Sequence, residues 1–263
     1  MLTDFLYKYT SSDKDCLFAL IADKQNFAKL ISPLNPEFIW PVTSNDDENW
    51  IVSRGIISDD AKILYPQEEE DKTINYRNGV FESRSGLWEI SSNLALSAIK
   101  NNSITISTKI KIDPNNAEQD YINIFYSGDQ QSHIQISYSL NSIDGNSLFV
   151  EFFVENGVPV QYELFNVSEY LFGKELLLTI VINPDDLKGD VIKIYADDEV
   201  IGIKKFETEE IDLINSKILP PNTNITFIND AGFDGGWNVK MKNFFIWNRA
   251  LSFNEIKLLT KLT

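Results

Sequence analysis

The sequence predicts an all-β protein, an antiparallel β-sandwich with a short C-terminal helix and a small N-terminal region. Runs of alternating apolar and polar residues recur along the chain with turn residues between them, and no helical pattern separates these runs. This order favours two antiparallel sheets packed face to face over alternating strands and helices. The 263 residues, of which 43% are hydrophobic, are enough to bury the core of one large β-domain.

The N-terminal part of the chain has the least regular pattern. Residues Asp15 to Ile31 fit either an amphipathic helix or a hairpin, and the sequence leaves both alternatives open. Three prolines then interrupt the chain, and the acidic run from Gln67 to Asp71 predicts a solvated loop. We therefore divide the chain into an N-terminal docking or tethering region, residues 1–73, and a sandwich domain, residues 74–263.

The predicted strands of the sandwich domain are marked by period-two runs. The clearest of these runs are Ile104–Ile112, Ile134–Tyr138, Leu148–Val154 and Ile192–Tyr195. Turn residues separate them, among them Asp144-Gly145.

The C-terminal helix is predicted from its cap and its apolar residues. Ser252 and Glu255 have the spacing of a capping box, in which each side chain bonds the backbone N–H of the other residue. A mostly apolar face follows, made of Phe253, Ile256, Leu258, Leu259 and Leu262. This pattern indicates a short helix that docks on the sandwich.

Four segments carry a resemblance to a known family. The closing segment Asn222–Leu262 contains FFIWNRALS, Lys174–Phe206 contains the hairpin IYADDEV, Asn102–Ile112 reads NSITISTKIKI, and Tyr121–Leu140 contains IFYSGD. In their order and spacing these segments resemble the laminin-G-type jelly rolls of the concanavalin A-like lectin and glucanase superfamily. The resemblance covers roughly Val80 to Thr263 and implies a jelly-roll sandwich, with Asp197 and Asp198 at the tip of the IYADDEV hairpin.

Composition limits the partners and the compartment. The net charge of −16 disfavours nucleic acid and anionic membrane surfaces, and no apolar run is long enough for membrane insertion. Cys16 is the only cysteine, so no intrachain disulfide can form. The N-terminus lacks a basic segment followed by an apolar one. We expect synthesis in the cytoplasm without a signal peptide.

The sequence predicts no enzyme. Glycanases of the superfamily use a strand with alternating carboxylates, and the nearest match here, Glu210-Ile-Asp212-Leu-Ile-Asn215, ends in an asparagine that cannot serve as the acid. His133 is the only histidine, which excludes a multi-histidine metal site. We interpret His133 as a polar residue at the start of a strand.

A calcium site is one hypothesis for the acidic loops. Related lectin-like domains often bind Ca²⁺ at the sandwich rim, and Ca²⁺ takes carboxylate and carbonyl oxygens. Asp230 and Asp234 span a glycine-rich turn, and Asp129 supplies a further oxygen if the loops converge. The alternative, solvated carboxylates in an acidic protein, stays open.

A sugar site would combine an aromatic ring with polar side chains, since the ring covers the apolar side of a pyranose. Trp237, beside Gly235-Gly236, is the main candidate, with Tyr126 and Asn229 as companions. Trp247 alternates with Phe245 and is predicted to be a core residue.

These observations predict a non-catalytic, lectin-like recognition or surface-decoration module that binds a glycan. The expected context is a larger assembly such as a virus, phage tail or injection particle, with other subunits contacting residues 1–73. The alternatives are a structural protein that uses the sandwich as a protein–protein interface and, less favoured, a glycan hydrolase.

Overall fold

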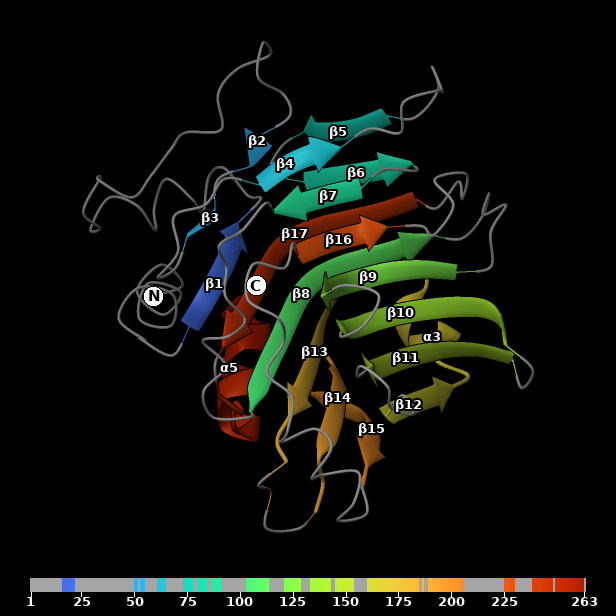
Figure 1. Cartoon of the computed structure of the whole chain (residues 1–263), viewed down its shortest axis with the longest axis vertical. Coiled ribbons are helices and arrows are strands. Elements are labelled where there is room, and N and C mark those ends of the chain that lie inside the picture. Colours follow the sequence, from blue (N-terminus) through green and yellow to red (C-terminus); the bar gives the residue numbers. More distant parts are fainter. Residues whose placement is uncertain are drawn as a thin grey trace.

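The structure is a computed structural model of the 263-residue chain. It describes residues 16–21, 50–51, 53–54, 61–64, 73–77, 80–84, 87–90, 103–113, 121–128, 133–142, 145–153, 160–184, 186, 189–205, 225–229, 238–247 and 249–262. These residues form two antiparallel sheets that pack as a β-sandwich (Figure 1), which confirms the predicted fold class.

The first sheet has nine described strands, and its main order is β15-β14-β13-β8-β17-β1-β3. Strand β6 also pairs with β17, and β5 pairs with β6. The bounds are β1 Cys16–Ile21, β3 Ser53–Arg54, β5 Thr73–Arg77, β6 Val80–Arg84, β8 Ile104–Asp113, β13 Leu176–Ile182, β14 Ile192–Ala196, β15 Glu199–Lys204 and β17 Asn238–Trp247.

The second sheet has eight described strands in the order β12-β11-β10-β9-β16-β7-β4-β2. Their bounds are β2 Trp50–Ile51, β4 Ala61–Leu64, β7 Leu87–Ile90, β9 Tyr121–Gly128, β10 His133–Ser142, β11 Gly145–Phe153, β12 Val160–Phe165 and β16 Ile225–Asn229. Strands β9 to β12 follow one another along the chain and form a meander at one end of the sheet.

The core lies between the sheets and is rich in β-branched residues. Strand β13 reads LLLTIVI and is buried at every position, so both of its faces are covered. In β8, Ile106 and Ile110 are buried, and across the core Ile136 and Val150 of the second sheet are fully buried. Trp247 is also fully buried, which confirms its predicted place inside the protein.

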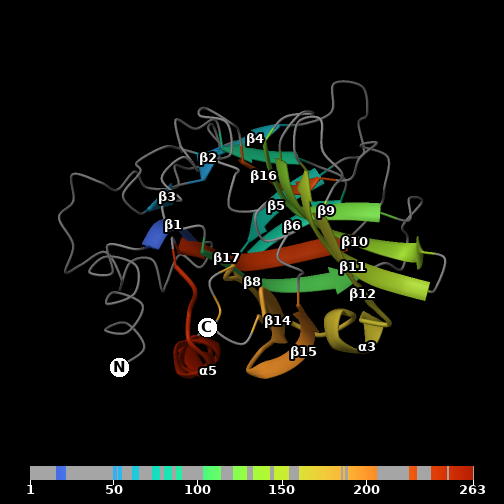
Figure 2. The same cartoon turned by 60° about the horizontal axis from the view of Figure 1, so that its bottom comes forward.

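The C-terminal helix α5, Phe253–Leu262, lies against the first sheet on the side away from β9–β12 (Figure 2). Its capping box is confirmed, because the Ser252 N–H donates to Glu255 Oε2 at 2.7 Å and the Glu255 N–H donates to Ser252 Oγ at 3.4 Å. The buried stripe is narrower than predicted. Ile256 and Leu259 are buried, whereas the side chains of Phe253 and Leu258 are 48% and 40% exposed.

The ambiguous N-terminal segment contains a strand. Residues 16–21 form β1, which pairs with β17 and β3, so the helical alternative is wrong for these residues. Strands β2 and β4 belong to the second sheet. The described strands of residues 1–73 thus pair within the two sheets, and the division at residue 73 stays a prediction.

The predicted hairpin at Asp197 joins β14 to β15. Asp197 has a φ of 56°, the left-handed conformation that a tight turn requires, and aspartate tolerates it better than most residues. Its Oδ1 accepts a hydrogen bond from the Leu177 N–H at 2.9 Å. The hairpin is therefore fixed to β13. A second helix, α3, is a single turn at Ser168–Leu171.

Candidate ligand-binding face

Strands β9 to β12 turn one face toward the first sheet and the other face away from it. Tyr162 and Leu164 of β12 lie on the inner face, because a Cβ built on Gly202 of β15 would stand 2.8 Å from the Tyr162 hydroxyl and 2.9 Å from Leu164 Cδ2. Side chains alternate along a strand, so Gln161 and Glu163 point the opposite way. We call this opposite side of β9–β12 the outer face.

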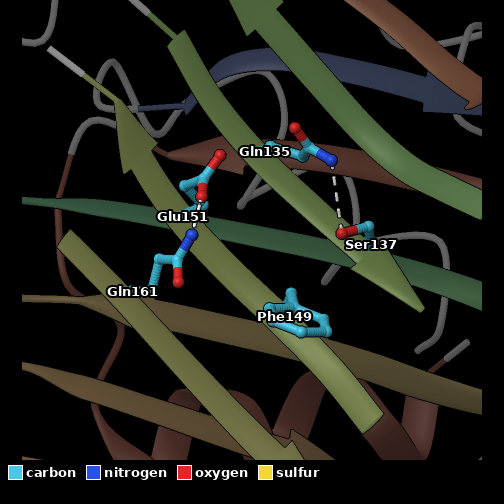
Figure 3. A pocket seen from close by; sticks show the side chains of 5 residues that line it. All are labelled: Gln135, Ser137, Phe149, Glu151 and Gln161. Carbon is cyan, nitrogen blue, oxygen red and sulfur yellow. Dashed lines mark hydrogen bonds between the residues drawn. The ribbon is translucent and has the colours of Figure 1, made fainter. Parts of the chain in front are cut away.

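An open pocket of about 260 Å³ lies on the outer face. Its lining comes from three neighbouring strands: Gln135 and Ser137 of β10, Phe149 and Glu151 of β11, and Gln161 of β12. Cross-strand pairing places them side by side, since Glu151 pairs with both Gln135 and Gln161, and Ser137 pairs with Phe149. Figure 3 shows the polar groups of this set around the single aromatic ring.

The polar side chains of the pocket are held by hydrogen bonds. Gln161 donates its amide N–H to Glu151 Oε2, and the Nε2 of His133 lies 3.0 Å from Glu151 Oε1. On the neighbouring strand, the Gln135 amide donates to Asn123 Oδ1 at 2.7 Å and to Ser137 Oγ at 3.4 Å. A side chain fixed in this way loses little rotamer freedom when a ligand binds.

Glu151 carries a negative charge in the pocket. The hydrogen bond from His133 holds the pKa of Glu151 below its ordinary value, burial opposes this shift, and the hydrogen bond from Gln161 adds to it. A general acid needs a pKa raised toward the working pH. Glu151 is therefore suited to accept hydrogen bonds as a carboxylate, not to deliver a proton.

Two residues predicted to bind sugar lie on strands beside this pocket. Tyr126 of β9 pairs with Gln135, and its ring centroid lies 5.0 Å from that of His133 with the planes tilted by 34°. Asn229 ends β16, where its backbone pairs with Asn123. His133 begins β10, as predicted, and is half-buried. The ligand roles of Tyr126 and Asn229 stay predictions.

The other predicted site residues, Trp237, Asp129, Asp230 and Asp234, lie outside the described residues. Within the part of the chain that is described, no group of three or more His, Cys, Asp or Glu side chains could hold a metal ion. No described helix has the length and apolar character needed to cross a membrane.

Sequence analysis missed all five residues that line the pocket. Their signal is present in the strands HIQIS, FVEF and VQYEL, where polar residues or a lone phenylalanine occupy every second position. This pattern identifies the solvent side of each strand. It does not identify which strands are neighbours, and the pocket exists only because β10, β11 and β12 are adjacent.

No protein-family model matches the chain, and no curated protein matches it. Solved structures do match, among them the binding domain of botulinum neurotoxin DC in complex with rat synaptotagmin II. That structure has a TM-score of 0.64 and 15% sequence identity, over 95% of this chain and 52% of the other.

Two further matches also concern botulinum neurotoxins. The binding domain of botulinum neurotoxin DC in complex with SialylT has a TM-score of 0.59 and 17% identity, over 82% of this chain and 49% of the other. A structure concerning cell entry of botulinum neurotoxin type C, dependent upon interaction with two ganglioside molecules, has a TM-score of 0.56 and 19% identity, over 82% of this chain and 52% of the other.

The chain thus spans about half the length of these solved structures. At this level of identity the similarity shows the fold, a β-sandwich found in binding domains. The narrower resemblance to laminin-G-type domains of the concanavalin A-like superfamily stays a prediction.

Proposed function

We propose that this protein is a non-catalytic glycan-recognition module and that the pocket on its outer face binds a sugar residue. The observation that carries this proposal is the combination of Phe149 with fixed amide and carboxylate groups in one open pocket. A pyranose presents an apolar side, which an aromatic ring covers, and hydroxyls, which amides and carboxylates bind. The lowered pKa of Glu151 supports binding over acid catalysis.

The similar solved structures support a binding role but do not assign the ligand. Two of them are named as binding domains, and the partners named with the three structures are rat synaptotagmin II, SialylT and two ganglioside molecules. Because this chain matches only about half of each structure, those partners can be contacted by the other half. We therefore base the proposed site on the pocket of this chain alone.

A second part of the proposal concerns the loop that contains Trp237. We propose that Trp237 adds a stacking surface for the glycan, and that Asp129, Asp230 and Asp234 bind Ca²⁺ beside it. This part rests on the sequence, in which Trp237 follows two glycines and Asp230 and Asp234 are spaced across the predicted turn. It is tested separately from the pocket.

The experiment is a glycan array on the purified protein, with and without Ca²⁺, followed by calorimetric titration of the best binder. Phe149→Ala and Gln161→Ala test the pocket, Trp237→Ala tests the loop, and Lys257→Ala on the exposed side of α5 is the control. If the pocket is the site, both pocket variants weaken binding by about tenfold or more and the control does not. Wild-type affinity in both pocket variants would contradict the pocket.

A second candidate function is a protein–protein interface, and exposed apolar residues on the first sheet favour it. Val200 and Ile203 of β15 are 41% and 48% exposed, and Val200 pairs with Tyr195, whose ring contacts that of Phe253 at 6.5 Å between centroids. Light scattering of the wild type and of Ile203→Lys tests this. Self-association of the wild type that Ile203→Lys abolishes would support the interface.

We also propose that the module is a subunit of a larger assembly made in the cytoplasm, attached through residues 1–73. A particle such as a phage tail, a virion or an injection particle would suit a chain with one cysteine, which needs no disulfide for its fold. Co-purification from the source cell tests this context.

A further inference from the structure

We infer that the outer face selects uncharged glycans and rejects anionic ones, including glycans that end in sialic acid. The inference rests on the proposed function and extends it by naming the ligand class. It is carried by the charged groups of β9–β12 and by a buried carboxylate oxygen beside the pocket.

The described strands of the outer face carry none of the side chains that usually bind anions. Strands β9 to β12 contain no lysine and no arginine, and their charged residues are Glu151 and Glu163, with His133 as the one basic side chain. The Nε2 of His133 is bonded to Glu151. Proteins recognise carboxylates and phosphates mainly with arginine and lysine. This face therefore offers an anionic sugar few bonds to replace those that its charged group makes with water.

Glu163 adds an acceptor next to the pocket. It pairs across the strands with Phe149, which lines the pocket, and it lies on the same outer face. Its Oε1 is buried and has no hydrogen-bond partner among the described residues. A buried acceptor without a donor costs free energy, so a rotation that turns this carboxylate toward a sugar hydroxyl over Phe149 would gain a hydrogen bond.

Ser147 lies on the same side of β11 as Phe149 but is fully buried. It lies two residues before Phe149 on β11, and its hydroxyl oxygen is also buried without a partner in the described part of the chain. Ser147 and Glu163 thus flank Phe149 on two strands. A hydroxyl-bearing ligand over Phe149 would lie beside the carboxylate of Glu163, which accepts hydrogen bonds.

The same groups act against an anionic ligand. A sialic acid carboxylate cannot donate to Glu163, and it would stand near two glutamates in a site partly removed from water. Like charges in such a site repel more strongly than in bulk water. Specificity therefore arises from repulsion of the wrong ligand as well as from bonds to the right one.

The test uses pairs of oligosaccharides that are identical except for a terminal sialic acid, titrated by calorimetry. Glu163→Gln keeps the shape and removes the charge, Glu163→Ala removes the acceptor, and Glu199→Gln on the exposed β14–β15 hairpin removes the same charge elsewhere. Thermal melting of each variant shows that it is folded.

We expect the wild type to bind the uncharged member of a pair about tenfold more tightly or better. Glu163→Gln should reduce the ratio of the two dissociation constants within a pair, and Glu163→Ala should weaken binding of the uncharged member by about tenfold. Glu199→Gln should change neither this ratio nor the affinity for the uncharged member. Equal or tighter binding of the sialylated member would overturn the inference and leave the proposed function standing. An unchanged ratio in Glu163→Gln would also overturn it, whereas no binding of any glycan would overturn the proposed function itself.

Discussion

The hydroxyl of Thr105 joins two distant parts of the chain, and its removal should destabilise the protein strongly. Thr105 lies on β8 and is fully buried. Its Oγ1 donates to the carbonyl oxygen of Arg249 at 2.8 Å and accepts from the N–H of Leu251 at 2.9 Å. These two bonds fix the segment that leads from β17 into α5. Valine has nearly the same shape but can form neither bond.

The magnitude of the Thr105→Val effect follows from these two bonds. A neutral hydrogen bond contributes about 1 kcal/mol net, and a buried N–H left without an acceptor costs about 1–3 kcal/mol. We therefore expect a loss of about 2–4 kcal/mol in the free energy of unfolding. For a chain of this size, this corresponds to a fall in Tm of roughly 5–15 °C. Thr105→Ser keeps the hydroxyl and removes one methyl group, so it should lose only about 1 kcal/mol.

The assay is urea unfolding followed by tryptophan fluorescence, with thermal melting as the second measurement. The variant should also show faster hydrogen exchange in α5, because the segment before the helix is released. The reasoning would be refuted if Thr105→Val lost less than about 0.5 kcal/mol, the range of a neutral surface change. It would equally be refuted if Thr105→Ser were as unstable as Thr105→Val.

Three further predictions concern the packing, the pocket and the helix cap. Gly202→Ala places a Cβ within 3.0 Å of the ends of the Tyr162 and Leu164 side chains and should cost about 1–3 kcal/mol in urea unfolding; a variant as stable as the wild type would show that these side-chain ends can move away. Because the folded pKa of Glu151 is lowered, its ionisation stabilises the fold above the unfolded pKa of about 4.3, and this contribution is lost as the pH falls through the folded pKa. The stability difference between the wild type and Glu151→Gln should accordingly shrink in acid, and a difference that is constant with pH would contradict this. Ser252→Ala removes the side-chain N-cap of α5 and should cost about 1 kcal/mol, measured by thermal melting. An unchanged Tm would instead show that the hydrogen bond from the residue 252 N–H to Glu255 is enough to cap the helix.

The strands that sequence predicted well are those with a strong local pattern. The run from Ile104 to Ile112 became β8, and the IYADDEV hairpin became β14 and β15 with Asp197 in the left-handed turn position. In each case the alternation of apolar residues and the turn residues lie within one short segment and predict the same structure. The cap of α5 was predictable for the same reason, because Ser252 and Glu255 are three residues apart.

The structure of residues 16–21 was not predictable in this way. The segment CLFALI is a short apolar run, which fits a buried strand or one face of a helix equally well. Its conformation is decided by its partner, since Phe18 to Ile21 pair with Asn243 to Ile246 of β17. Local propensity carries no information about a partner that lies near the other end of the chain.

The candidate site could not be predicted for the same reason, because the sequence does not tell which strands are neighbours. Loops often carry function, and the predicted residues Asp234 and Trp237 stand beside glycines in a predicted loop. The pocket instead lies on strands, and each of its residues has an ordinary polar position in its own strand. Gln135 and Gln161 come together only because both pair with Glu151.

Which side of β12 faces outward is a separate question that alternation alone cannot answer. The strand VQYELF alternates polar with apolar or aromatic residues, and Tyr162 is as plausible a sugar-binding residue as Gln161 when only the sequence is considered. In the structure the Tyr162 hydroxyl lies between the two sheets, where Gly202 has no side chain and leaves room for it. Tyr162 thereby becomes a packing residue, and Gln161 and Glu163 are left on the outer face. The packing of β12 against the opposite sheet thus determines which of its residues can contact a ligand.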